Sequence, residues 1–175
     1  MLVDIIAGAR PNFMKIAPVI EAIQKEQRRG TNIRYRLVHT GQHYDRNMSD
    51  SFFEQLGIPK PSINLEAGSG SQAEQTAAIM TRYEKVLLAA RPDLIIVVGD
   101  VTSTMACAIT AKKMGNVKVA HIEAGIRSND MSMPEEINRI VTDSITDYFF
   151  TTTHTANENL RATGVPDERI FFVGN

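Results

Sequence analysis

The sequence predicts an α/β domain in which a doubly wound parallel sheet is covered by helices on both faces. Short apolar runs rich in β-branched residues recur along the chain, and longer stretches with helical spacing separate them. Near-continuous apolar strands are typical of a parallel sheet that is buried on both faces. The 175 residues, of which 43% are hydrophobic, suffice for one domain with its own core.

The expected strands and helices alternate in chain order. Strands are expected at 2–7, 33–40, 94–98, 117–122, 148–152 and 170–173, with a short one at 62–65 inside a loop at 57–70. Helices are expected at 12–29, 46–56, 71–90, 101–114, 134–146 and 154–163. Pro11 suits a helix start, Gly30 follows two arginines at a helix end, and Pro92 stops the third helix.

The composition argues against several classes of protein. The 19 basic and 20 acidic residues nearly cancel, so the chain lacks the positive excess of nucleic-acid-binding or membrane-surface proteins. Cys107 is the single cysteine, which excludes a disulfide framework and indicates a reducing compartment. No apolar run approaches the roughly 18 residues of a membrane span. We therefore expect a cytoplasmic protein that binds neither nucleic acid nor membrane.

Polar residues collect directly after several of the predicted strands, where ligands bind in an open parallel sheet. The segments are 8–15, 40–45, 99–104 and 123–136, and they include Arg10, Lys15, Gln42, His43, Asp100, Glu123 and Glu135. Arg10 and Lys15 oppose the dipole of the helix that they begin. A shared anion such as a diphosphate explains these two cations better than solvation does.

Structural explanations compete for some of these residues. Asp100 can equally cap the helix that follows it. Glu135 can form a capping box with Ser132, and its spacing to Arg139 is that of a helical ion pair. Glu123 follows an apolar strand directly, so a functional role is favoured because an unpaired carboxylate there is costly.

Other patterns are weaker. The segment 68–73 fits a loose G-x-G-x-x-A pattern, but no long strand precedes it, so a dinucleotide site is not expected. His121 and Glu123 are expected on the same face of a strand, yet no His or Cys cluster has metal-ligand spacing. The spacing therefore gives no signature of a metal or dinucleotide site.

Carboxylates that face a bound anion suit proton transfer next to a phosphorylated leaving group. The cations would stabilise the charge on that group, and the carboxylates would act as general acid and base. A nucleotide sugar fits this description, because it has a diphosphate leaving group and a ring with removable protons.

A series of short motifs resembles the N-terminal domain of the non-hydrolysing UDP-N-acetylglucosamine 2-epimerases over essentially the whole chain. The motifs are Gly8-Ala-Arg-Pro-Asn-Phe-Met-Lys15, Thr40-Gly-Gln-His-Tyr-Asp45, Val98-Gly-Asp100, His121-Ile-Glu-Ala-Gly-Ile-Arg127, Pro134-Glu-Glu-Ile-Asn-Arg139 and Val173-Gly-Asn175. The resemblance implies the first of two Rossmann-like domains in a glycosyltransferase-B-type architecture. It also implies an active site between the domains and a homodimer.

The resemblance assigns roles by position. It implies that Arg10 and Lys15 lie near the substrate's diphosphate and sugar. It makes Asp100, Glu123 and Glu135 the catalytic carboxylates, with Arg139 beside them; Gln42 and His43 are expected to bind substrate. The implied reaction interconverts UDP-GlcNAc and UDP-ManNAc through 2-acetamidoglucal, by loss and re-addition of UDP. It needs neither a cofactor nor a metal. Which carboxylate serves which proton step stays open.

The chain departs from the family's common G-T-R-P-E start, because Ala9 and Asn12 replace the Thr and the Glu. Two other functions stay open: a hydrolysing relative that releases ManNAc and UDP, and a non-catalytic domain that binds nucleotide sugars. The family's uridine-binding residues lie in a second domain. We therefore expect 1–175 to be a truncated domain that is inactive when isolated.

Overall fold

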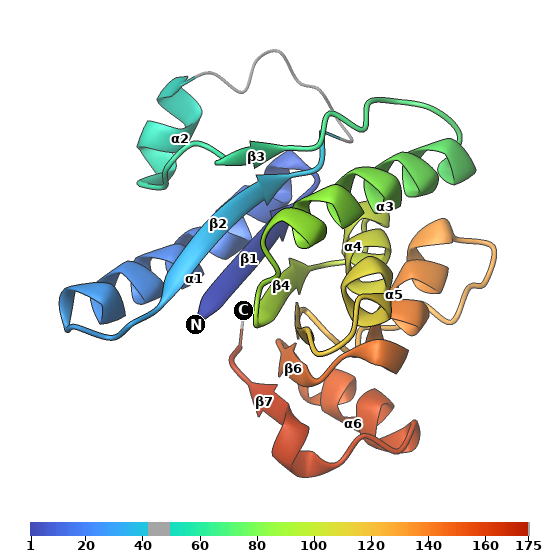
Figure 1. Ribbon diagram of the computed structural model, residues 1–175. Helices are drawn as coiled ribbons and strands as arrows, with labels where there is room; N and C mark the ends of the chain where they lie inside the picture. Colours follow the sequence, from blue (N-terminus) through green and yellow to red (C-terminus); the bar gives the residue numbers. More distant parts are fainter. Residues whose placement is uncertain (42–49, 175) are drawn as a thin grey trace.

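The computed structural model describes residues 1–41 and 50–174 and confirms a Rossmann-like α/β fold (Figure 1). In this part of the chain one parallel sheet has the strand order β3-β2-β1-β4-β5-β6-β7. The strands are β1 (Leu2–Ala7), β2 (Arg34–His39), β3 (Ile63–Asn64), β4 (Leu94–Val98), β5 (Lys118–Ile122), β6 (Tyr148–Thr151) and β7 (Ile170–Phe172). The helices are α1 (Arg10–Arg28), α2 (Asp50–Leu56), α3 (Gln72–Ala89), α4 (Thr102–Lys113), α5 (Pro134–Ile145) and α6 (His154–Ala162), and a 3₁₀ turn, Asp167–Arg169, precedes β7.

The predicted boundaries agree with these elements to about two residues, as is usual for helix ends. The predicted start of the helix at 46–56 lies outside the described residues. The short strand expected at 62–65 is β3, which pairs with the end of β2. None of the helices in the described residues is both long enough and apolar enough to cross a membrane.

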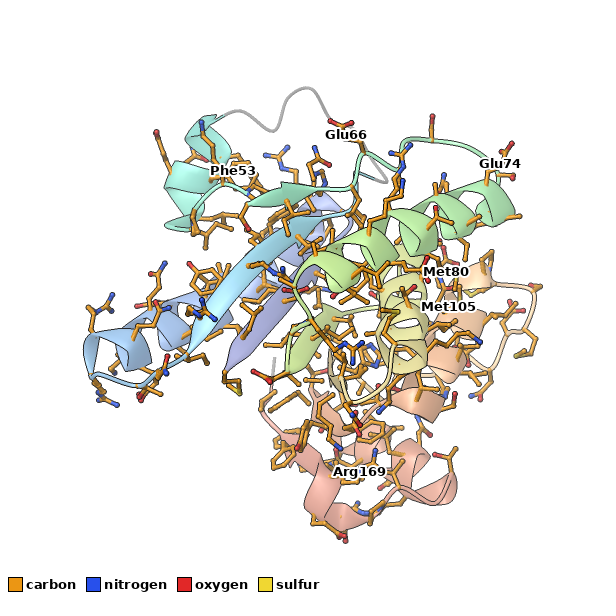
Figure 2. The ribbon with its side chains drawn as sticks, viewed as in Figure 1. Phe53, Glu66, Glu74, Met80, Met105 and Arg169 are labelled. Atoms are coloured by element: carbon orange, nitrogen blue, oxygen red, sulfur yellow. The ribbon has the colours of Figure 1, made fainter. Side chains whose placement is uncertain are left out.

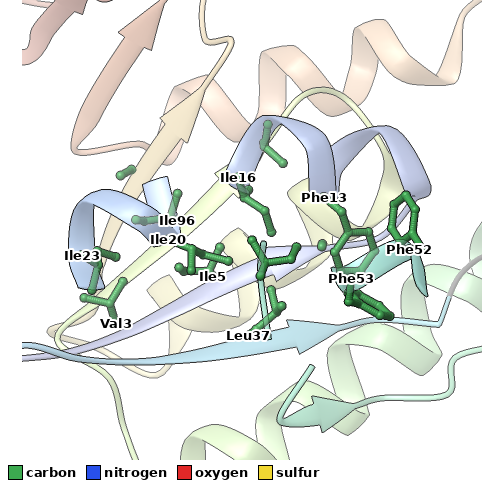
Figure 3. Packing of buried hydrophobic residues seen from close by; sticks show 14 residues of the cluster. Val3, Ile5, Phe13, Ile16, Ile20, Ile23, Leu37, Phe52, Phe53 and Ile96 are labelled. Atoms are coloured by element: carbon green, nitrogen blue, oxygen red, sulfur yellow. The ribbon is translucent and has the colours of Figure 1, made fainter. Parts of the chain in front are cut away.

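Helices cover both faces of the sheet. Helices α1 and α2 pack on one face, and α3 and α4 on the other, with α5 alongside α4 (Figure 1). Phe13, Ile16 and Ile20 of α1 pack onto Ile5 of β1 and Leu37 of β2 (Figure 3). Fully burying such side chains contributes about 1.5–3 kcal/mol each, so this layer fixes α1 on the sheet.

The strand order reverses next to β1. The chain runs outward from β1 to β2 and β3, then returns to β4 on the other side of β1. Ligands bind at such a switch point, beyond the carboxyl ends of the strands. The turns after β1 and β4 therefore mark the edge at which a site is expected.

Helix α5 turns its polar side chains inward. Its buried residues are Glu136, Asn138, Thr142 and Asp143. Ile137 and Ile140 are instead 44% and 38% exposed. Ile137 lines a surface groove with Met80 of α3 and Met105 of α4, which are neighbours in Figure 2. The buried side chains of Glu136, Asn138 and Asp143 form hydrogen bonds with the turns that follow the strands.

A buried ion pair joins β1 to β2, and a tyrosine of α3 forms a hydrogen bond with it. Asp4 of β1 is fully buried and lies opposite Arg36 of β2 in the strand register. Its two carboxylate oxygens accept hydrogen bonds from Arg36 at 2.6 and 2.8 Å. The Tyr83 hydroxyl of α3 donates to Asp4 at 2.9 Å, and burial, with Asp4 nearby, raises the pKa of that hydroxyl.

Replacing Asp4 with Asn should lower the free energy of unfolding by about 3 kcal/mol, because a largely buried Arg36 then lacks its counter-charge. Urea denaturation measures this loss. The matched control, Tyr83→Phe, removes one hydrogen bond to the same carboxylate and should cost about 1 kcal/mol. A loss for Asp4→Asn no larger than the control would contradict the importance of the ion pair.

Candidate active site

One buried side chain holds the turn between β1 and α1. The Asn12 side-chain oxygen accepts hydrogen bonds from the Gly8 and Ala9 N–H groups at 3.1 and 2.8 Å. Its amide nitrogen donates to the Val98 carbonyl of β4 at 3.4 Å. A Cβ at Gly8 would lie 2.2 Å from Oγ of Ser103, so the turn also needs a glycine there. Asn12 therefore fixes the start of α1 against the end of β4.

Lys15 and Glu123 form an ion pair across the switch point. Lys15 Nζ lies 2.7 Å from Glu123 Oε2, and the two side chains are 40% and 17% exposed. Glu123 has a φ of 67°, so the chain leaves the strand conformation after Ile122. The prediction that His121 and Glu123 share a strand face is wrong, because β5 ends at Ile122. His121 is fully buried and contacts Asp143 of α5, whereas Glu123 contacts Lys15 of α1.

Asp100 lies in the turn after β4 and is held by α5. Its carboxylate accepts a hydrogen bond from Arg139, and its main-chain carbonyl accepts one from the Asn138 amide at 2.8 Å. The N-cap of α4 is Val101, with no side-chain cap, so the helix-capping explanation of Asp100 is wrong. The structure thus brings Asp100 and Arg139 together, as expected for residues of one site.

Glu136 is a buried anion that the sequence did not single out. Its side chain is only 1% exposed in the chain. It accepts hydrogen bonds from the N–H groups of Ser128 and Asn129 at 3.0 and 3.1 Å and from Arg139 at 2.8 Å. Burial alone would raise the pKa of Glu136, but these donors lower it to about 2. The carboxylate is therefore ionised and orients the same Arg139 that holds Asp100.

Glu135 is half-buried, and no hydrogen bond or ion pair joins it to another described residue. Both structural explanations considered for it are wrong. The N-cap of α5 is Met133, because Ser132 instead donates to Asp130 at 2.6 Å. Arg139 pairs with Asp100 and Glu136 rather than with Glu135. The Glu135 carboxyl is left available one helical turn from Arg139.

The remaining candidates are only partly placed. Arg10 is the first residue of α1, and its guanidinium carbon lies 4.7 Å from the centre of the Phe52 ring. No ion pair joins Arg10 to another described residue. Gln42 and His43 lie outside the described residues. At 68–73, Ser71 caps α3 in a capping box with Glu74, which accounts for that pattern structurally.

The geometry suits acid–base chemistry beside an anion. Asp100 and Glu123 follow neighbouring strands, β4 and β5, and a Cβ at Gly99 would lie 3.3 Å from Glu123 Oε2. Carboxylates in hydrogen-bonding reach of a ligand can move protons, and the cations at the start of α1 can stabilise a leaving anion. No metal-binding group of three His, Cys, Asp or Glu side chains occurs among the residues that the structure describes.

The sequence contained a signal for the buried polar residues that were missed. In 134–146, Ile137 and Ile140 are three residues apart and share a helical face, and Glu136, Asn138 and Asp143 lie away from its centre. Such a pattern normally predicts that the isoleucines face the core. Here the polar side chains meet unpaired main-chain groups of the strand-end turns, so the usual orientation is reversed.

Replacing Glu136 with Gln should lower the free energy of unfolding at neutral pH by about 2 kcal/mol, because charged hydrogen bonds to buried donors are lost. The pKa of this carboxyl is depressed in the folded state, so its contribution is complete above about pH 4.5 and declines as the pH falls toward 2. The gap between wild type and variant in urea titrations should narrow over that range. The control Glu135→Gln should change stability by less than about 0.5 kcal/mol; a gap that stays constant with pH would contradict the account.

Comparisons with known proteins agree on one family. A family model described as UDP-N-acetylglucosamine 2-epimerase matches residues 25–175. The UDP-N-acetylglucosamine 2-epimerase of Methanocaldococcus jannaschii is 46% identical over 175 residues, which are 100% of this chain and 46% of that protein. The UDP-2,3-diacetamido-2,3-dideoxy-D-glucuronate 2-epimerase of Pseudomonas aeruginosa is 46% identical over 159 residues, which are 91% of this chain and 44% of that protein.

Solved structures share the fold. The crystal structure of the M. jannaschii enzyme in complex with UDP-GlcNAc and UDP has a TM-score of 0.92 at 46% identity, covering 100% of this chain and 47% of that one. A Neisseria meningitidis enzyme bound to UDP-GlcNAc has a TM-score of 0.90 at 32% identity, covering 100% and 46%. The chain spans about half the length of the curated relatives it matches. With a matching family model, sequence and fold, the chain belongs to the UDP-N-acetylglucosamine 2-epimerase family.

Proposed function

We propose that residues 1–175 form the N-terminal domain of a non-hydrolysing enzyme that interconverts UDP-GlcNAc and UDP-ManNAc. The observation that carries this proposal is the placement of Asp100 and Glu123 in adjoining strand-end turns, each beside a cation. Glu135, without a partner among the described residues, is the third carboxylate of the same region. The relative from M. jannaschii, whose structure contains UDP-GlcNAc and UDP, supports the choice of substrate.

The proposed reaction is an elimination followed by an addition. One carboxylate removes the proton at C2 while the C1–O bond breaks and UDP leaves with the bonding electrons, which gives 2-acetamidoglucal. UDP then adds back to C1 as a proton is delivered to the opposite face of C2. Asp100, Glu123 and Glu135 are the carboxylates available for these transfers. Lys15 and Arg10, at the start of α1, stabilise the negative charge on the departing diphosphate.

A second domain completes the enzyme in this proposal. The relatives are about twice as long as this chain, so the full-length protein carries residues 1–175 followed by a domain that binds the uridine. The two domains take the glycosyltransferase-B-type arrangement, and the substrate lies between them. The chain alone is therefore inactive. A homodimer and a cytoplasmic location stay predictions.

The reaction products distinguish the proposed epimerase from two alternative functions. A hydrolysing relative would release ManNAc and UDP, and a binding domain would turn over nothing. A second candidate substrate comes from the Pseudomonas relative, which shares the same 46% identity and acts on a UDP-2,3-diacetamido-uronate. Offering UDP-GlcNAc and that sugar in competition separates the two by their relative kcat/KM.

The full-length protein, incubated with UDP-GlcNAc in deuterium oxide, should yield UDP-GlcNAc and UDP-ManNAc that both carry deuterium at C2, because C2 is deprotonated and reprotonated from solvent. NMR and mass spectrometry of the recovered sugars measure the label. Free ManNAc would instead indicate the hydrolysing reaction. Unlabelled, unchanged UDP-GlcNAc would contradict the proposed function.

Asp100→Asn in the full-length protein should reduce the rate of C2 exchange by about 10²–10⁴-fold, the usual contribution of a general acid or base. The thermal unfolding midpoint and circular dichroism should show that the fold is retained. Glu84→Gln, at an exposed position of α3, is the matched control and should exchange at the wild-type rate. Undiminished exchange in Asp100→Asn would remove this carboxylate from the mechanism.

A further inference from the structure

His121 occupies an unusual place in the sheet. It is a fully buried residue of β5, and both of its ring nitrogens have partners. Nδ1 lies 2.8 Å from the Asp143 carboxylate of α5, and Nε2 lies 2.9 Å from the Gly99 carbonyl in the turn after β4. No step of the proposed reaction uses this side chain.

Both partners of His121 are acceptors. A carbonyl oxygen can only accept, so Nε2 must carry the proton in its hydrogen bond to Gly99. The second oxygen of Asp143 accepts hydrogen bonds from Arg127 at 2.7 Å and from the Gly125 N–H at 3.1 Å, as an ionised carboxylate does. Burial alone would raise the pKa of Asp143, but the hydrogen bond and charge of His121, with Arg127, lower it. Because Arg127 and the Gly125 N–H already pair with this carboxylate, Nδ1 faces an ionised acceptor and also donates.

We propose, on the basis of the function inferred above, that His121 is a doubly protonated positioning residue that holds the turns of Asp100 and Glu123 relative to each other. One N–H anchors the carbonyl of Gly99, the residue directly before Asp100. The other anchors Asp143, which in turn holds the N–H of Gly125, two residues after Glu123.

The surroundings favour an imidazolium ion. The Asp143 carboxylate faces the ring from α5, the Gly99 carbonyl faces it from the end of β4, and Arg127 lies on the far side of Asp143. A neutral ring would leave one of the two buried acceptors without a donor, at a cost comparable to a lost hydrogen bond. The carboxylate offsets much of the cost of burying the cation.

The two turns that His121 holds, at Gly125 and at Asp100, are also fixed by other contacts. A Cβ at Gly125 would lie 2.4 Å from the Ala156 carbonyl of α6, so this turn is already packed against the next helix. Asn138 and Arg139 hold Asp100 from the same α5 that supplies Asp143. A small shift of His121 therefore moves both carboxylates that would flank the sugar. Misplacements of about 1 Å can cost about 100-fold in rate.

Nitrogen-15 NMR of the full-length protein, labelled in its histidines, tests the proton count directly. Both ring nitrogens of His121 should show a directly bonded hydrogen at neutral pH. His39 is the internal reference for a neutral ring, because burial lowers its pKa. Asp143→Asn should cost His121 one of its ring protons. A bare nitrogen on wild-type His121 at neutral pH would overturn the proposal, whatever the enzyme's activity.

The kinetics of the full-length protein test the positioning role. His121→Gln should lower kcat for C2 exchange about 100-fold while KM for UDP-GlcNAc changes less than about threefold. Asp143→Asn should have a similar effect, and the double variant should lose little more, because both act through one network. A kcat equal to wild type in His121→Gln or in Asp143→Asn would overturn the positioning role.

The two proposals fail differently. A wild-type protein that exchanges no deuterium would overturn the proposed function, while the NMR result would still decide the protonation of His121. Glu84→Gln is again the control for non-specific effects of substitution. A loss confined to the unfolding midpoint, with kcat unchanged, would show that His121 only stabilises the fold.

Discussion

The site depends on buried carboxylates that must be fully satisfied by donors. Glu136 and Asp143 lie on the inward face of α5, and each accepts hydrogen bonds from an arginine and from main-chain N–H groups of the 125–129 segment. An unpaired charge in such surroundings would cost several kcal/mol, so the turns, the arginines and the helix must take up mutually compatible positions. This constraint explains why α5 buries Glu136 and Asp143 while Ile137 and Ile140 are exposed.

The sheet topology brings the candidate catalytic side chains together at the carboxyl ends of the strands. The reversal of strand order beside β1 places the turns after β1, β4 and β5 next to one another. Asn12 ties the first of these turns to β4, and Arg139 ties the second to α5. Glu123 leaves its strand in a left-handed conformation, which turns it toward Lys15. Cations and acids from distant parts of the sequence thus meet without a shared local motif.

Most of the fold could be predicted from the sequence, because alternating strand and helix patterns dictate a covered parallel sheet. Lys15, Asp100 and Glu123 could be placed by their position at strand ends alone. The partners of the charged residues on α5 could not be predicted, since the capping box that Ser132 and Glu135 offer is not used and Arg139 pairs with Asp100 and Glu136. The predicted helix start at 134 is correct, but successive side chains on a helix differ by about 100° in direction, and the sequence pattern alone did not show that Glu136 is buried and Glu135 half-buried.

The same reasoning explains what could not be seen at His121. The sequence places it in a strand, but its partners come from a turn and a helix whose positions no strand pattern encodes. Polar partners of buried groups are long-range contacts. These partners can be identified only when the order of the strands in the sheet is known.

The proposed reaction requires that Asp100, Glu123 and Glu135 surround the reacting carbon of the sugar. A crystal structure of the full-length protein with bound UDP-GlcNAc tests it most directly. Carboxylates from this set should lie on both faces of C2, with at least one within about 3–3.5 Å of it. A bound sugar whose C2 contacts none of the three would contradict the account.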